Sequence, residues 1–302
     1  ELLGQMRPGL VQLEIGVQST NPETLKVIHR PTDLEKIGCT TARINEGKNI
    51  HQHLDLIAGL PFEDFASFQN SFNQVYAMRP EQLQLGFLKV LNGSPMEAMA
   101  NGYGIVSSPN PPYEVLFTPW LSYKEVLALK GVEEMVEIHY NSRQFVTAMS
   151  LLEREFASPY EMFEALARYY EREGLDRLSH SRMARFEILW NFISGLGLGA
   201  ETMEEYRDAL MTDLYLRENA KSRPSFARAP SYARQQAVRL LNGREENPPV
   251  LMEYRQMDSG QRARLFHLEE MRDGSLLLFD YRRRDPLSYN AVCWEIQIHA
   301  PS

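Results

Sequence analysis

The sequence has only two cysteines, and this scarcity limits what can hold the fold together. Cys39 and Cys293 lie far apart in the chain and provide neither a disulfide framework nor a quartet of metal-binding thiolates. A chain of 302 residues can bury a core large enough to fold without such cross-links. Two unpaired cysteines suit a reducing compartment, so we expect a cytoplasmic protein.

The sequence also lacks long apolar runs and an excess of positive charge. No run approaches the ~18 apolar residues that a membrane span needs, so we expect no membrane partner. The formal net charge is −8, which argues against a general nucleic-acid-binding surface. The run Arg282-Arg283-Arg284 is flanked by Asp280 and Asp285, and this pattern is more typical of a surface ionic network than of an RNA site.

Residues 10–96 alternate between strand and helix patterns. Apolar residues recur at every second position from Val11 to Val17, as in a strand with one buried face. Asn21-Pro22-Glu23 supplies a cap and a proline for the start of a helix. Strands are expected at residues 11–17, 49–58 and 82–90, and helices at residues 23–28, 35–46 and 65–76. This β-α-β-α-β order predicts parallel strands joined by helical crossovers.

The remainder of the chain has a different pattern. Glycines and prolines cluster in residues 101–121, which we expect to form a linker. Helical patterns then follow at residues 123–140, 142–156, 159–173, 179–192 and 202–216, and short strands are expected at residues 250–254, 264–271, 275–281 and 292–299. We therefore expect an α/β domain at residues 1–100 and, at residues 122–302, a mainly α-helical domain with a small terminal β element.

Candidate site residues stand where the predicted strands end. The carboxyl ends of parallel strands form the reactive surface of α/β proteins. Gln18 ends one strand, Asp55 lies inside an apolar run of the next, and Arg30 lies at a helix terminus that can face the same region. An arginine there can grip a carboxylate with two hydrogen bonds. The ordinary alternatives are a loop glutamine and a structural carboxylate that pairs with Arg30 alone.

His51 and His53 form a His-x-His pattern on one predicted strand, so both side chains point to the same face. That spacing can contribute two ligands to a metal site. No third ligand is indicated by the sequence. We therefore predict no metal site in this chain.

The strand-end segments resemble those of the radical S-adenosylmethionine superfamily, in its branch of coproporphyrinogen oxidases and cobalamin-dependent members. Residues 16–30, from Gly16-Val17-Gln18-Ser19 to His29-Arg30, are similar to the fourth barrel strand and the helix after it. Residues 55–61, ending in Gly59-Leu60-Pro61, are similar to the fifth strand, and residues 84–96 to the sixth. The resemblance covers roughly residues 1–100. It implies the C-terminal half of a (β/α)6 partial TIM barrel.

The resemblance also implies cofactors and roles for particular residues. Gln18, Arg30 and Asp55 match positions that contact S-adenosylmethionine in the family, with Arg30 on the methionyl carboxylate. Ile57, Gly59, Leu60 and Pro61 match the segment near the adenine. Members hold a [4Fe–4S] cluster and take an electron from a flavodoxin- or ferredoxin-like donor. Residues 122–302 are similar to an uncharacterised C-terminal domain of cobalamin-binding members, so cobalamin is a possible cofactor.

The sequence departs from the family in one decisive respect. The cysteine motif Cys-x3-Cys-x2-Cys, whose thiolates hold the cluster, is missing. We therefore expect a C-terminal fragment that is inactive alone and belongs to an oxidoreductase or methyltransferase. An exposed half-barrel predicts a homodimer or an aggregation-prone preparation. Two alternatives remain open: an unrelated α/β-barrel enzyme without a cluster, in which Asp55 and the histidines act as acid–base groups, and a non-catalytic module that binds protein or RNA.

Overall fold

The computed structural model describes residues 2–176, 178–230 and 250–296. The chain forms two compact units. The first unit comprises Glu1–Ser142 and Glu153–Arg177, and the second comprises Arg143–Leu152 and Leu178–Ser302. This division differs from the one expected from sequence, because residues 101–121 and the first helices after them belong to the first unit.

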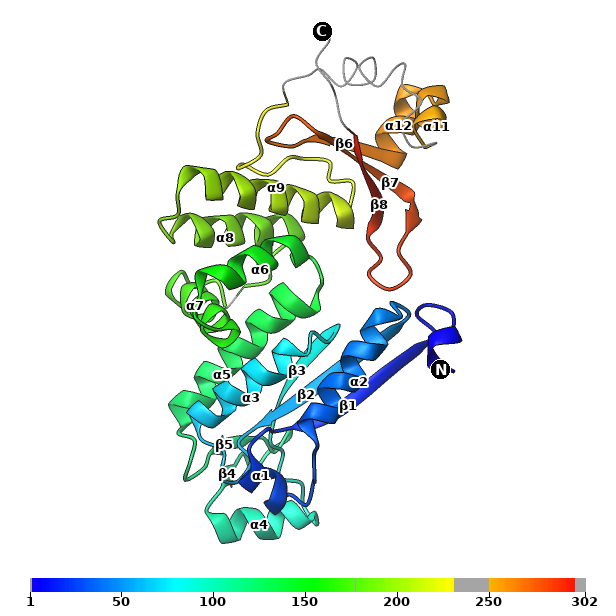
Figure 1. Ribbon diagram of the computed structural model, residues 1–302. Coiled ribbons are helices and arrows are strands. Elements are labelled where there is room, and N and C mark those ends of the chain that lie inside the picture. The colour runs from blue at the N-terminus through cyan, green and yellow to red at the C-terminus, as the bar shows by residue number, and fades with distance from the viewer. Residues whose placement is uncertain (1, 177, 231–249, 297–302) are drawn as a thin grey trace. The chain divides into compact units, whose positions relative to one another are not determined.

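The first unit is built on a parallel sheet in the order β1-β2-β3. The strands are β1 (Val11–Gln18), β2 (Ile50–Ala58) and β3 (Gln82–Phe87). The helices between them are α1 (Pro22–Val27), α2 (Leu34–Glu46) and α3 (Phe65–Ala77), and a 3-10 turn, η1 (Leu3–Gln5), precedes β1. Figure 1 shows α2 and α3 running along the sheet. The predicted β-α-β-α-β order is therefore confirmed.

The two faces of this sheet differ in burial. Along β2, Leu54, Leu56 and Ala58 are fully buried, on the same face as the buried Gln52. The alternate residues of β2, among them His53, Asp55 and Ile57, are only partly buried. One face thus forms the core beneath the helices, while polar side chains lie on the other.

At the outer edge of β3, a side chain makes the backbone hydrogen bonds that a neighbouring strand would otherwise make. Helix α5 (Tyr123–Val136) continues into a π-helical turn, η2 (Glu137–Asn141). The Asn141 amide accepts from the Leu83 N–H at 2.9 Å and donates to the Leu83 carbonyl at 3.0 Å. Asn141 therefore replaces both hydrogen bonds that a neighbouring strand would make to Leu83.

The segment after β3 packs against the sheet end and is not a linker. Its elements are α4 (Pro95–Tyr103), β4 (Val106–Ser107) and β5 (Val115–Phe117), with β4 and β5 antiparallel. The backbone of Leu88 bonds back to Ala58 through its N–H and receives the Val115 N–H on its carbonyl. The third strand consequently ends at Phe87, not at Val90 as expected, because the chain changes its partner there. Two further elements, η3 (Glu153–Glu155) and α7 (Pro159–Arg172), complete the first unit.

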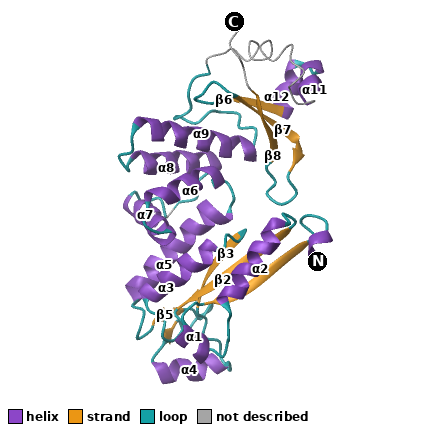
Figure 2. Cartoon of the chain, viewed as in Figure 1, coloured by secondary structure: helices purple, strands orange, loops and turns teal. Residues whose placement is uncertain are grey.

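The second unit contains three packed helices, α6 (Val146–Leu152), α8 (Arg182–Ser194) and α9 (Ala200–Arg217) (Figure 2). Asp213 of α9 is buried, and its carboxylate accepts from the backbone N–H groups of Thr147 and Ala148 at 3.0 and 2.9 Å. These N–H groups belong to the first turn of α6, where no intrahelical acceptor exists. A side chain from another helix thus caps α6.

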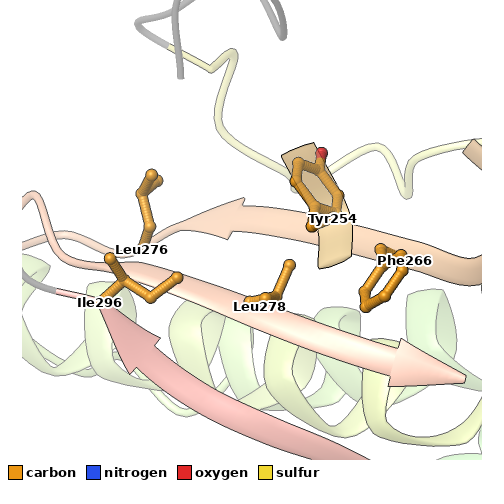
Figure 3. Packing of buried hydrophobic residues seen from close by; sticks show 5 residues of the cluster. All are labelled: Tyr254, Phe266, Leu276, Leu278 and Ile296. Carbon is orange, nitrogen blue, oxygen red and sulfur yellow. The ribbon is translucent and has the colours of Figure 1, made fainter. Parts of the chain in front are cut away.

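The second unit ends in an antiparallel sheet of β6 (Phe266–Glu270), β7 (Leu276–Arg284) and β8 (Ala291–Ile296), with two helices before it, α11 (Val250–Gln256) and α12 (Ser259–Leu265). Figure 3 shows Tyr254 of α11 packed over one face of the sheet, with Phe266, Leu278 and Ile296. The hairpin of β6 and β7 confirms the sequence prediction. The strand predicted at residues 250–254 is wrong: the segment is helical, and it buries Tyr254 against the sheet.

Candidate functional site

Gln18, Arg30 and Asp55 meet around Gly16, at the carboxyl end of β1. Gln18 donates from Nε2 to Asp55 Oδ2 at 2.5 Å, and Arg30 donates from Nε to the Gly16 carbonyl at 2.9 Å. A Cβ on Gly16 would lie 2.6 Å from Arg30 Nη2 and 2.7 Å from Gln18 Nε2. A side chain at this position would therefore displace the ends of Arg30 and Gln18 from where they now lie.

The backbone of β1 explains why these groups converge. The pairing of β1 with β2 is irregular between Gly16 and Gln18, and Gln18 has a φ of 70°. A positive φ is uncommon for a residue other than glycine. This bend turns the Gln18 side chain towards Asp55, on the partly buried face of the sheet.

Two opposing effects act on the pKa of the Asp55 carboxyl group. Burial raises the pKa of Asp55 above its ordinary value, while the Gln18 hydrogen bond and the Arg30 charge act to lower it. Arg30 is itself exposed, and its side chain makes one hydrogen bond among the described residues, through Nε, which leaves its two Nη groups available. The guanidinium group of Arg30 and the carboxylate of Asp55 can therefore contact the same ligand.

The remaining predicted site residues lie in and after β2. Ile57 shares the partly buried face with Asp55. Gly59 has a φ of 88°, and a Cβ there would lie 2.8 Å from Val115 Cγ1. Leu60 is buried, and the Pro61 carbonyl accepts from the Thr24 hydroxyl at 2.8 Å. Gly59, Leu60 and Pro61 therefore hold the loop after β2 against β5 and α1.

Sequence reasoning missed a buried carboxyl next to this site. Glu63 is only 1 % exposed, and its Oε1 accepts from the hydroxyls of Ser19 and Ser71 at 2.6 and 2.9 Å. Its Oε2 has no hydrogen-bond partner among the described residues. Burial raises the pKa of Glu63 to about 7. No sequence signal marks this group, because its partners lie 44 and 8 residues away.

His51 and His53 lie on the same face of β2, as predicted, with ring centroids 6.1 Å apart. The His53 Nδ1 lies 3.2 Å from Gln12 Nε2, so a glutamine from β1 occupies one side of this ring. Within the described ranges, no group of three or more His, Cys, Asp or Glu side chains could hold a metal ion.

A cavity of about 540 Å³ lies beside Asp55, at the carboxyl ends of β2 and β3. Asp55 and Ile57 line it from β2, and Gln84 lines it from β3. Its other polar lining residues come from the segment after β3 and from α5: Lys89, Glu114, Lys130 and Glu133. The candidate site is therefore a polar hollow on the open face of the sheet.

Comparisons with known proteins found a similar solved structure and a matching sequence family. A solved structure from Escherichia coli, described as that of coproporphyrinogen III oxidase, a radical SAM enzyme, has 20% sequence identity and a TM-score of 0.32. The likeness covers 48% of this chain and 33% of that protein, so the chain spans about a third of its length. No protein with a curated description matches the sequence. In the described part of the chain, no helix is both long and apolar enough to cross a membrane.

The second match is a sequence family described as "Protein of unknown function (DUF4080)". It covers residues 101–278, from the segment after β3 to the middle of β7. This range includes the wall of the cavity formed by Glu114, Lys130 and Glu133. Since the match spans more than half of its residues, the chain belongs to the DUF4080 family.

Proposed function

We propose that this chain binds S-adenosylmethionine through Gln18, Arg30 and Asp55, as part of a radical S-adenosylmethionine enzyme. The observation that supports this most directly is the convergence of the three side chains at the carboxyl end of β1. These residues match the family's contact positions in sequence. They also form one constellation in space, at the end of a parallel sheet where ligands of α/β proteins bind.

The chemistry of the three groups suits the amino-acid end of S-adenosylmethionine. The free Nη groups of Arg30 can bind the methionyl carboxylate in two-pronged fashion. Asp55 can accept from the α-ammonium group, and Gln18 holds Asp55 in place by the 2.5 Å hydrogen bond. An incoming ammonium would also compensate the burial that raises the pKa of Asp55.

The residues of this chain do not fit a [4Fe–4S] cluster. Such a cluster needs three thiolates from one site, whereas the two cysteines lie in different units, Cys39 exposed on α2 and Cys293 on β8. We therefore assign to this chain only the binding and orientation of S-adenosylmethionine. Whether the whole enzyme oxidises or methylates its substrate, with or without cobalamin, depends on groups that this chain does not supply.

Equilibrium binding of radiolabelled S-adenosylmethionine to this chain tests the assignment. Asp55→Asn and Arg30→Gln should each weaken binding about tenfold, which corresponds to about 1.4 kcal/mol and lies near the lower range for hydrogen bonds to charged groups. Arg43→Gln, which removes another exposed arginine of the first unit, is the matched control and should leave the affinity unchanged. Unchanged affinity in both site variants would remove these residues from the site.

The wider assignment has a separate test in the gene. A Cys-x3-Cys-x2-Cys segment encoded upstream of Glu1 would support a radical enzyme, and its absence there would remove the radical mechanism. Binding of S-adenosylmethionine by this chain could still stand in that case. The two tests therefore fail independently.

A further inference from the structure

The cavity beside Asp55 has a charge balance that points to the chemistry of its ligand. Two of its lining residues are basic, Lys89 and Lys130, and three are acidic, Asp55, Glu114 and Glu133. All five belong to the first unit. Which charges remain uncompensated depends on the contacts that each side chain makes.

The charge of Lys130 is already engaged within the protein. Its Nζ forms an ion pair with Glu114 Oε2 and lies 4.3 Å from the centroid of the Phe87 ring. An ion pair and a cation–π contact together satisfy one ammonium group. Glu114 and Lys130 therefore neutralise each other and fix the wall of the cavity.

Lys89 does not compensate the acidic lining either. Its backbone pairs with Glu114 in an isolated antiparallel bridge, and its side chain is exposed to solvent. An exposed ammonium group is well hydrated, and its field is screened over short distances by salt. Lys89 thus lies at the solvent-facing rim of the cavity.

Glu133 is the acidic group without a partner. Its carboxylate is partly buried on α5 and makes no hydrogen bond or ion pair among the described residues. Burial raises the pKa of Glu133, and the neighbouring acids Glu137, Glu114 and Glu134 add to the rise, against the lowering effect of Lys130. A partly desolvated carboxylate surrounded by other acids gains most from a cationic partner.

We infer that this cavity binds a substrate that carries a basic nitrogen, an amine or a guanidine, with Glu133 as its counter-ion and the attached apolar chain along Ile57 and Phe87. The inference rests on the proposed function, because it places this substrate beside the residues assigned to S-adenosylmethionine. A volume of about 540 Å³ is within the range of small-molecule sites. The mixed lining supplies an apolar surface and one oriented charge, as such sites require.

A local reporter can test the inference on the whole chain. Ile57 lines the cavity, so its δ1 methyl group, labelled with 13C and assigned with an Ile57→Val variant, reports ligand entry by NMR. The probe is n-hexylammonium chloride, with n-hexanol as the uncharged analogue and n-hexanoate as the anionic one. We expect n-hexylammonium to shift the Ile57 signal saturably, at least tenfold more tightly than either analogue.

The matched variants are two adjacent glutamates on α5. Glu133→Gln should weaken n-hexylammonium binding about tenfold. Glu134→Gln removes the same charge one residue away, but Glu134 lines a different cavity, against α7, and should change the affinity less than twofold. Equal losses of n-hexylammonium affinity in the two variants would show that only the general negative potential attracts the ligand, and would overturn the inference. Binding of n-hexanol by the unaltered protein as tightly as n-hexylammonium would also overturn it.

The same samples separate this inference from the proposed function. Glu133→Gln should retain S-adenosylmethionine binding, and Arg30→Gln, which lies outside the cavity lining, should retain n-hexylammonium binding. If S-adenosylmethionine does not bind while n-hexylammonium does, the cofactor assignment is overturned and the basic ligand stands. If n-hexylammonium does not bind while S-adenosylmethionine does, only the substrate class is overturned.

Discussion

Replacing Glu63 by glutamine should remove the pH dependence that this residue gives to the stability of the first unit. Glu63 is 1 % exposed and accepts from two serine hydroxyls, and its pKa is raised by burial from the usual 4.5 to about 7. The folded protein therefore holds this proton more tightly than the unfolded chain does. The resulting stability is present at low pH and is lost as the pH rises from about 4.5 to about 7.

The size of the effect follows from the shift itself. Raising the pKa of Glu63 from 4.5 to about 7 corresponds to about 3 kcal/mol of stability. About 1 kcal/mol of this stability is already lost at pH 5, so about 2–3 kcal/mol separates pH 5 from pH 8. Glu63→Gln keeps an acceptor for Ser19 and Ser71 but adds an amide without a partner, which costs about 1–2 kcal/mol at every pH.

Urea unfolding at pH 5 and pH 8 measures this difference. Trp120 lies against Phe62 in the first unit, with ring centroids 4.6 Å apart, so its fluorescence reports this unit when Trp190 and Trp294 are replaced by phenylalanine. In that background, the stability of Glu63→Gln relative to the parent should rise by about 2–3 kcal/mol from pH 5 to pH 8. The exposed Glu46→Gln is the control and should show no such change.

A constant difference between Glu63→Gln and the parent at both pH values would refute the reasoning. It would mean that Glu63 titrates in the folded protein as it does in the unfolded chain. A fall in relative stability with rising pH would be a stronger contradiction. It would show that the serine hydroxyls outweigh burial and keep the carboxyl ionised.

Three further substitutions test other contacts. Gly16→Ala should weaken S-adenosylmethionine binding at least tenfold, measured by equilibrium dialysis, because the new methyl group displaces Arg30. Asn141→Leu should lower the free energy of unfolding of the first unit by about 3 kcal/mol, measured in urea, since it leaves the buried N–H and carbonyl of Leu83 unpaired. Asp213→Ala should destabilise the second unit by about 2–3 kcal/mol, seen as faster amide exchange in α6, because two N–H groups lose their acceptor.

Each of these substitutions has a control variant or an outcome that would contradict it. Gly4→Ala meets no atom within 4 Å and should change neither binding nor stability. A loss below about 1 kcal/mol for Asn141→Leu would show that water replaces the amide at the edge of β3. Asp213→Asn keeps an acceptor at the same position, so a loss as large as that of the alanine variant would mean that the charge at the start of α6 matters more than the hydrogen bonds.

Local patterns predicted the elements whose burial follows a simple period. The strands at residues 11–17 and 49–58 were expected from alternation and from a break at their ends, and both occur. The strands of the β6–β7 hairpin were expected at residues 264–271 and 275–281, and both occur. Alternating burial leaves a period of two in the sequence, which a pattern can register even when the paired strand is distant, as β2 is from β1.

The errors arose where distant contacts decide the structure. Apart from Glu253, residues 250–254 are apolar and show no clear period, and the need to bury Tyr254 favours a helix there. The third strand stops at Phe87 because Leu88 pairs with Val115, far along the chain. The helix expected at residues 123–140 likewise changes at Glu137 into a π-helical turn, whose Asn141 hydrogen-bonds to Leu83 of β3.

The position of the candidate site could be predicted from the sequence, but the buried groups around it could not. Strand-end reasoning located Gln18 and Asp55, and the structure brings them within hydrogen-bond distance. The buried Glu63 and the unpartnered Glu133 could not be found in this way, because burial and the absence of a partner are properties of the folded chain. That Glu133 faces a basic ligand is a chemical inference from these folded surroundings.

Because of the π-helical turn at Glu137–Asn141, the hydrogen bonds at the edge of β3 depend more on the length of this segment than on its composition. A π-turn holds one residue more than an α-turn, and the extra residue sets the direction of Asn141. Deleting a single residue here would restore an α-helix and rotate the amide by about 100° around the helix axis. Leu83 would then lose its partner although every other side chain in the turn remained. Among proteins of this family, the count of residues between α5 and Asn141 should therefore be held more tightly than their identity.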